Sequence, residues 1–249
     1  MNGKIWAVTG TLGGGKTTFG AEVGLIHQRG GGWMFTNVAF FADRVRDWMA
    51  SCGVRFDPSR LVMLTGELSE FHKQVFRGTP EQPVLVLIDE ASLDFNARDY
   101  RDTSRDLLAF VNFVRKLDIH LVFITQRFED LDKQFRARVA ELFVCRNMKA
   151  LKIWGLIPCP LPFYFRVRFD NTRGNGRPVK LDSEVVFRSW AWGLFDSNAL
   201  TGKGHEQFLA MQTAHASPLE KIERPAKSSA SPLWPYLLAA FSAVLFSSL

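Results

Sequence analysis

The strongest constraint on the fold of this chain is a glycine-rich segment near its amino terminus, Gly10-Thr11-Leu12-Gly13-Gly14-Gly15-Lys16-Thr17. It fits the phosphate-loop pattern G-x-x-x-x-G-K-[ST] at every fixed position. The apolar run Ile5 to Val8 before it is suited to a buried strand, and residues 18–26 after it can form a helix. Because strand, loop and helix in this order are the context of the motif, we expect a phosphate-binding loop rather than a chance glycine-rich turn.

The residue types in this segment predict how a nucleotide would be bound. Glycines let backbone N–H groups point inward around the β- and γ-phosphates, and the helix amino terminus adds its positive end. We therefore expect the segment from Gly10 to Thr18 to surround the phosphates. Lys16 would contact the β- and γ-phosphate oxygens, and the Thr17 hydroxyl would ligate Mg²⁺. The expected ligands are ATP and Mg²⁺.

Apolar runs alternate with helical patterns over the first 130 residues. The candidate strands after the loop are residues 33–38, 61–64, 84–88 and 119–126, and the helical patterns are residues 43–52, 68–77 and 99–115. With 249 residues, of which 47% are hydrophobic, the chain can bury a sizeable core. The alternation predicts an α/β fold of the P-loop NTPase class, with a mostly parallel sheet flanked by helices.

Polar side chains follow two of the predicted strands. Asp89 and Glu90 come directly after the apolar run Val84 to Ile88, and Gln126 ends the next strand. Beside a phosphate loop, Asp89 is expected to bind Mg²⁺ directly or through water, and Glu90 to activate the attacking water. Gln126 fits a polar sensor that hydrogen-bonds this water or the γ-phosphate. Both features could also have a purely structural role, because paired carboxylates also cap helices and polar residues commonly end strands.

An arginine from a neighbouring subunit often stabilises the transition state of phosphoryl transfer. Six arginines of this chain are candidates: Arg98, Arg101, Arg105, Arg127, Arg136 and Arg138. We favour Arg136 or Arg138 because both follow the strand that carries Gln126. The sequence does not choose among the six.

Positive charge is concentrated in one part of the chain. The net charge is +6, and residues 142–188 contain 9 basic and 3 acidic side chains. Short β-like runs in this range alternate apolar and basic residues, which predicts one buried and one cationic face. Basic side chains bind backbone phosphates without reading sequence, and aromatic rings can stack on bases. We expect a basic β region at 142–188 that binds DNA, although most of its aromatic residues would belong to the core.

The carboxyl terminus differs from the rest of the chain, because its last 22 residues carry no charge. We predict an ATPase domain at 1–198, a linker at 199–231 and an apolar helix at 232–249 that could cross a bilayer about 30 Å thick. Lys221, Arg224 and Lys227 precede that helix and no cation follows it, which favours a cytoplasmic amino-terminal domain. Alternatively, the helix docks on the domain or on a partner.

Taken together, these elements resemble the zonular occludens toxin-like family, which includes the assembly ATPases of filamentous phages and belongs to the wider FtsK/HerA group. The matching segments are Val8 to Thr17, Phe35-Thr36-Asn37-Val38, Leu87-Ile88-Asp89-Glu90-Ala91, Arg115 to Ile119, Ile124-Thr125-Gln126 and Leu194 to Ser197. The phosphate loop and the Asp-Glu strand occur in many NTPases. Only their combination with Thr36-Asn37 and Gln126 indicates this family, over about residues 4 to 198.

The resemblance implies a ring-forming viral ATPase that moves phage DNA through or towards a membrane during virion assembly. Its partners would be phage assembly proteins, and its location the host inner membrane with the ATPase domain in the cytoplasm. Family members usually continue into a periplasmic domain, whereas this sequence stops at Leu249. A second interpretation is therefore a genome-packaging ATPase at the membrane or vertex of a virion, with capsid proteins as partners. A third is a nucleotide-dependent membrane interaction protein with negligible turnover.

Overall fold

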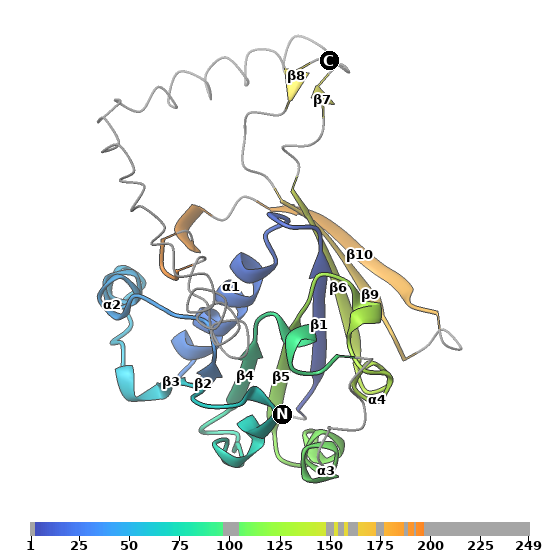
Figure 1. The fold of residues 1–249 in the computed structure, drawn as a ribbon. Coiled ribbons are helices and arrows are strands. Elements are labelled where there is room, and N and C mark those ends of the chain that lie inside the picture. The colour runs from blue at the N-terminus through green and yellow to red at the C-terminus, as the bar shows by residue number, and fades with distance from the viewer. Residues whose placement is uncertain are drawn as a thin grey trace, which may run out of the picture. The chain divides into compact units, whose positions relative to one another are not determined.

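The computed structural model describes residues 3–96, 105–147, 152–153, 157–158, 164–172, 177–186, 189–191 and 193–196. Eight strands form the main sheet: β1 (Ile5–Gly10), β2 (Trp33–Thr36), β3 (Leu61–Met63), β4 (Val84–Ile88), β5 (Ile119–Ile124), β6 (Glu141–Asn147), β9 (Tyr164–Asp170) and β10 (Val179–Val186). Their order in the sheet is β10-β9-β6-β1-β5-β4-β2-β3 (Figure 1). A separate small sheet pairs β7 (Lys152–Ile153) with β8 (Ile157–Pro158).

The main sheet is parallel from β3 to β6. The pairs β2 with β3, β2 with β4, β4 with β5, β1 with β5 and β1 with β6 are all parallel. β9 joins β6 in the antiparallel sense, and β10 joins β9 in the same way. The prediction of a mostly parallel sheet is confirmed. Because β1, β4 and β5 run in one direction, their carboxyl ends meet at the same edge, where ligands bind in such sheets.

Helices cover both faces of this sheet. They are α1 (Lys16–Arg29), α2 (Ala42–Ser51), α3 (Arg105–Phe113) and α4 (Lys133–Arg136), with short 3-10 turns at Pro58–Arg60, Leu68–Lys73, Ala91–Leu93, Phe128–Asp130 and Ser189–Ala191. Side chains of α1 and α2, such as Leu25 and Met49, pack in one hydrophobic cluster. Those of α3 and α4, such as Val111 and Phe135, pack in the other. The two clusters lie on opposite faces of the sheet.

The strand β4 shows why a continuous apolar run is needed at the centre. Successive side chains of a strand point to opposite faces. Val86 and Ile88 accordingly belong to the α3 cluster, whereas Leu85 and Leu87 belong to the α1 cluster. All of them are buried, and burial of each such side chain stabilises the fold by roughly 1.5–3 kcal/mol. Because β5 pairs with both β1 and β4, this packing places the ends of β4 and β5 beside the loop that follows β1.

The structure adds detail to two expectations, and two others lie outside its described residues. The strands β6, β9 and β10 of the basic β region, which is expected within the ATPase domain, extend the same sheet as β1. The short helix expected at 68–77 is a 3-10 helix over Leu68–Lys73. The linker at 199–231 and the apolar helix at 232–249 lie outside the described residues. Among the residues that are described, no helix combines the length and apolar character needed to cross a membrane.

Candidate nucleotide-binding site

The segment between β1 and α1 forms a tight loop at the carboxyl edge of the sheet. β1 ends at Gly10 and α1 begins at Lys16. Gly10 has φ of +145°, and a Cβ there would lie 2.1 Å from the carbonyl oxygen of Cys145 on β6. Gly15, with φ of +85°, also lies in the left-handed region that only glycine adopts readily. The glycines that the motif requires are thus needed by the backbone as well.

Lys16 is the first residue of α1 and turns back towards the loop. Its Nζ donates a hydrogen bond of 3.0 Å to the carbonyl oxygen of Thr11. Partial burial lowers the pKa of Lys16, and the carboxylates of Asp89 and Glu90 oppose that shift. A cation at the amino end of a helix, beside open backbone N–H groups, is suited to bind the oxygens of a polyphosphate.

Asp89 lies immediately after β4 and is held from two directions. Its Oδ2 accepts a hydrogen bond of 2.7 Å from the hydroxyl of Thr17. The Asn37 amide donates to the carbonyl oxygen of Asp89 at 2.9 Å, and the Asp89 N–H donates to Asn37 Oδ1 at 2.8 Å. Burial raises the pKa of Asp89, while hydrogen bonds from Thr17 and the Glu90 N–H counteract the shift. The end of β4 is thereby fixed against the start of α1.

Glu90 has an unusual backbone conformation. Its φ of 53° places it in the left-handed region, as for only one other non-glycine residue among those described, Asp118. Such a conformation costs on the order of 1–3 kcal/mol and is often found at functional positions. Burial raises the pKa of the Glu90 carboxyl, and the neighbouring Asp89 raises it further. A carboxyl group in these surroundings holds a proton more readily than an exposed one, as a general base must.

These residues line one cavity of about 640 Å³. Its walls are Leu12, Gly13, Gly14, Gly15, Lys16, Thr17, Thr18, Asn37, Val38, Ala39, Asp89, Glu90, Ser92, Leu93, Thr125, Gln126, Tyr164, Gly193, Phe195 and Asp196. Gln126 is tied to the loop, because its carbonyl oxygen accepts a hydrogen bond of 3.2 Å from the Gly10 N–H. The structure therefore brings Lys16, Glu90 and Gln126 to the same cavity.

The two favoured arginines lie at the opposite edge of the sheet from the phosphate loop. Arg136 and Arg138 precede β6, and the nearby Ala140 N–H bonds to the carbonyl oxygen of Ile5, at the amino end of β1. The phosphate loop follows the carboxyl end of β1, roughly 17 Å away at about 3.3 Å per residue. Arg138 donates to the Asn112 side chain and to the carbonyl oxygen of Gln134 in α4. Their action on a neighbouring subunit's nucleotide stays a prediction.

Two residues near the loop have no recognisable sequence signal. Asn147 ends β6 and Tyr164 begins β9, and they are opposite each other in the antiparallel register. The Asn147 amide donates a hydrogen bond of 3.1 Å to the carbonyl oxygen of Gly13. A Cβ at Gly15 would lie 2.3 Å from the Tyr164 ring, so the ring occupies that space. Only the pairing of β6 with β9, which the sequence does not reveal, brings both to the site.

The predicted cationic face needs correction at Arg166. This residue is 6% exposed, and its guanidinium pairs with Glu22 of α1 at 3.2 Å and with Glu184 of β10 at 3.0 Å. The guanidinium also lies 4.4 Å from the ring centroid of Phe19. Its charge is neutralised inside the protein. Arg166 therefore joins the hairpin of β9 and β10 to the helix that follows the phosphate loop.

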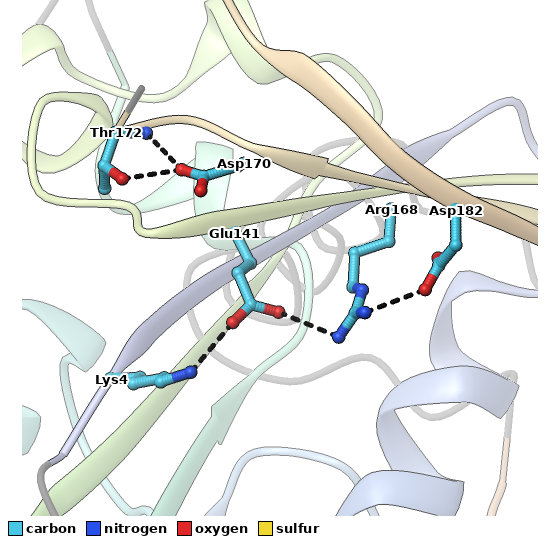
Figure 2. A network of polar contacts seen from close by, with 6 residues as sticks. All are labelled: Lys4, Glu141, Arg168, Asp170, Thr172 and Asp182. Atoms are coloured by element: carbon cyan, nitrogen blue, oxygen red, sulfur yellow. Dashed lines mark hydrogen bonds and ion pairs between the residues drawn. The ribbon is translucent and has the colours of Figure 1, made fainter. Parts of the chain in front are cut away.

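Arg168 is paired as well. Figure 2 shows its guanidinium between Glu141 and Asp182, at 3.7 Å and 2.8 Å, with Lys4 on the other oxygen of Glu141. Arg166 and Arg168 are two residues apart on β9 and therefore lie on the same face of the sheet, but both are paired with carboxylates there, so this face is not a free cationic one. The described basic residues of this region that are exposed are Arg146, Arg177 and Lys180.

The arrangement as a whole has a phosphate loop after β1, paired carboxylates after β4, and β5 with its polar end between these strands. Such a fold and site define a P-loop NTPase. The chain belongs to the zonular occludens toxin (Zot) family, whose model matches residues 4–174. The family resemblance is confirmed, while placement in the wider FtsK/HerA group and the boundary at residue 198 stay predictions.

Solved structures with a similar fold include the N-terminal domain of zonular occludens toxin from Neisseria meningitidis. It is 15% identical, with a TM-score of 0.50, and the match covers 79% of this chain and 100% of that one. The genome packaging NTPase B204 from Sulfolobus turreted icosahedral virus 2, in complex with ATP-gammaS, is 10% identical, with a TM-score of 0.45 and coverage of 74% and 97%. A search of curated proteins finds no sequence that matches this chain.

Proposed function

We propose that this protein hydrolyses ATP at the cavity beside its phosphate loop. The observation that carries the proposal is the 2.7 Å hydrogen bond from Thr17 to Asp89, which joins the start of α1 to the end of β4. Glu90 and Gln126 line the same cavity. A phosphate-binding loop, a pair of oxygen ligands and a carboxylate base are the parts that phosphoryl transfer to water requires.

The residues present fit a magnesium ion. The Thr17 hydroxyl and the Asp89 carboxylate are hard oxygen donors that already converge, and Mg²⁺ in such sites takes few protein ligands together with phosphate oxygens and water. Thr17 would hold the ion and Asp89 would hold it directly or through water. When bound, it neutralises charge on the β- and γ-phosphates.

The remaining chemistry belongs to the side chains around the phosphates. The loop N–H groups and Lys16 bind the triphosphate, and Gln126 orients a water molecule. Glu90 accepts a proton from this water as its oxygen forms a bond to the γ-phosphorus, and the bond from that phosphorus to the bridging β,γ-oxygen breaks. The products are ADP and inorganic phosphate, and Glu90 then releases its proton to solvent.

For the work done by hydrolysis, we infer movement of viral DNA during virion assembly. Family membership supports this inference, since the resemblance implies assembly ATPases of filamentous phages. The exposed cations Arg146, Arg177 and Lys180 offer contacts to DNA phosphates. Packaging of DNA into a capsid would use the same site. Neighbouring genes would separate the two motors, because export needs a coat and a secretin whereas packaging needs a capsid and a portal-like vertex.

The DNA part of the proposal is tested by the ATPase rate of the full chain with and without single- and double-stranded DNA. We expect DNA to stimulate phosphate release. Replacing Arg177 and Lys180 together by Glu should reduce the stimulation, whereas Arg55→Glu, at an exposed position outside the basic region, should not. Hydrolysis that no DNA stimulates, with no DNA binding, would favour the non-motor interpretation.

A further inference from the structure

Tyr164 is the aromatic residue that the fold places directly against the phosphate loop. It begins β9, is half-buried and lines the cavity together with Gly13 to Thr18. Its ring fills the space beside Gly15, where a Cβ would come within 2.3 Å of a ring carbon. Asn147, its register partner on β6, binds the carbonyl oxygen of Gly13. The end of β6 and the start of β9 therefore contact the phosphate loop at two neighbouring points.

The positions of the catalytic groups determine the direction in which a nucleotide would lie. In the sheet, β5 and β4 lie on one side of β1, and β6 and β9 lie on the other. Asp89, Glu90 and Gln126 follow β4 and β5, so the γ-phosphate must face that side. The nucleoside of the bound nucleotide would then extend from the loop in the opposite direction, towards β6 and β9. Tyr164 lies on that side.

We propose that Tyr164 forms a wall for the nucleoside part of ATP, with its ring against the base or the ribose. This inference rests on the proposed function. Aromatic rings stack on nucleobases through their faces and tolerate different bases, and a tyrosine hydroxyl adds a hydrogen-bonding group. Contact with Gly15 fixes the ring relative to the phosphates, so it would set the distance between nucleoside and loop. Tyr164 is a binding residue in this account and takes no part in the chemical step.

The test compares two ligands that share phosphates but differ in the nucleoside. Binding of ATPγS and of inorganic tripolyphosphate, both with Mg²⁺, is measured by calorimetry on the full chain. Tyr164→Leu keeps an apolar group beside Gly15 but removes the ring. We expect it to weaken ATPγS binding by about tenfold and to leave tripolyphosphate binding unchanged. Tyr164→Phe should keep most of the affinity for ATPγS.

The control is Phe113→Ala, an exposed aromatic residue at the end of α3 and outside the cavity, which should alter neither affinity. Equal weakening of both ligands by Tyr164→Leu would mean that Tyr164 only supports the loop, and unchanged ATPγS binding would mean that it does not touch the nucleoside. Either result overturns the inference. If the wild-type protein bound neither ligand, the proposed function itself would fail, and the inference with it.

Discussion

Asp89 illustrates how much of the site depends on single contacts. Its carboxylate meets Thr17 from the phosphate loop, while both polar backbone groups of the same residue meet the side-chain amide of Asn37. The next residue, Glu90, has a left-handed backbone conformation. The proposed base, Glu90, and the proposed metal ligand, Asp89, are consecutive residues at one strand end, which leaves little freedom between them.

Replacing Glu90 by Gln should separate binding from hydrolysis. The amide keeps the shape of the side chain but cannot accept a proton from water, so we expect the rate of phosphate release to fall at least about a hundredfold. ATP binding should persist, and the free energy of unfolding should not fall, because a negative charge beside Asp89 is removed. Phosphate release assays, nucleotide binding and urea denaturation check the three expectations.

The matched control is Glu129→Gln, at an exposed position outside the cavity, which should leave the rate unchanged. If Glu90→Gln hydrolysed ATP at the wild-type rate, another group would have to be the base.

At this scale the sequence predicts what is local. Gly10 to Thr17 form a contiguous motif, and Asp89 and Glu90 end an apolar run, so their positions at the carboxyl edge of the sheet could be predicted from the sequence. Asn37 entered only through the family resemblance, because nothing near it in the sequence indicates a bond to Asp89. Tyr164 was missed for the same reason, since its position depends on the pairing of β9 with β6.

Among the elements, α1 and the β9–β10 hairpin are connected by a buried ion pair. Glu22 and Arg166 are 5% and 6% exposed, and Glu184 provides a second partner for the guanidinium. A buried pair adds little net stability, but removal of one partner leaves a charge without compensation. The helix that begins at Lys16 is therefore mechanically tied to a strand on the far side of β6.

The corresponding prediction is that Arg166→Met destabilises the fold by about 3–5 kcal/mol, because the buried carboxylate of Glu22 loses its cationic partner. The double variant Arg166→Met with Glu22→Gln should recover a large part of this loss. Urea denaturation of both variants checks the difference. As a comparison, Arg46→Met breaks an exposed pair with Asp43 and should change stability by less than about 1 kcal/mol. Equal effects of the buried and exposed substitutions would contradict the account.

A second prediction concerns the amino edge of the sheet, where His27 of α1 and His120 of β5 lie with ring centroids 6.2 Å apart. Burial lowers the pKa of both rings, and a hydrogen bond between His27 and the Pro83 carbonyl opposes the shift for His27. Because the unfolded chain binds these protons more tightly, their contribution to stability is present above about pH 6.5 and is lost as pH falls below it.

Urea midpoints measured between pH 7.5 and 5.5 check this prediction. The variant His120→Phe keeps an aromatic ring beside Trp6, with which His120 stacks at 5.6 Å, and should show a flatter pH dependence. An identical slope in the variant and the wild type would show that His120 is not responsible.

The sequence predicts the parallel strands well, because β4 is a continuous apolar run and β5 is apolar except for His120, and only a doubly covered sheet can bury such runs. It does not predict that β6, β9 and β10 extend this sheet, nor that the arginines of β9 pair with carboxylates. Alternation of apolar and basic residues on β9 shows which residues share a face, but the charges opposite Arg166 and Arg168 come from α1, β6 and β10. Such partners become visible only when the strand order is known.

On the scale of the whole molecule, the parallel sheet and its two helical layers bring distant segments to one edge. The phosphate loop near residue 10, the carboxylates near residue 90 and Gln126 line one cavity there. Tyr164 lines the same cavity on the side of β6 and β9. Membership of the Zot family agrees with this layout. Our central claim is that this edge is an ATPase site, from which the proposed work on DNA follows.

The most direct test is the rate of phosphate release by the full chain and by its Lys16→Ala variant, with ATP and Mg²⁺. Removal of the ammonium leaves phosphate charge unpaired in the transition state, so we predict a loss of at least about a hundredfold. Lys116→Ala, an exposed lysine outside the cavity, serves as the control and should keep the wild-type rate. Hydrolysis by Lys16→Ala at the wild-type rate would contradict the assignment of the site.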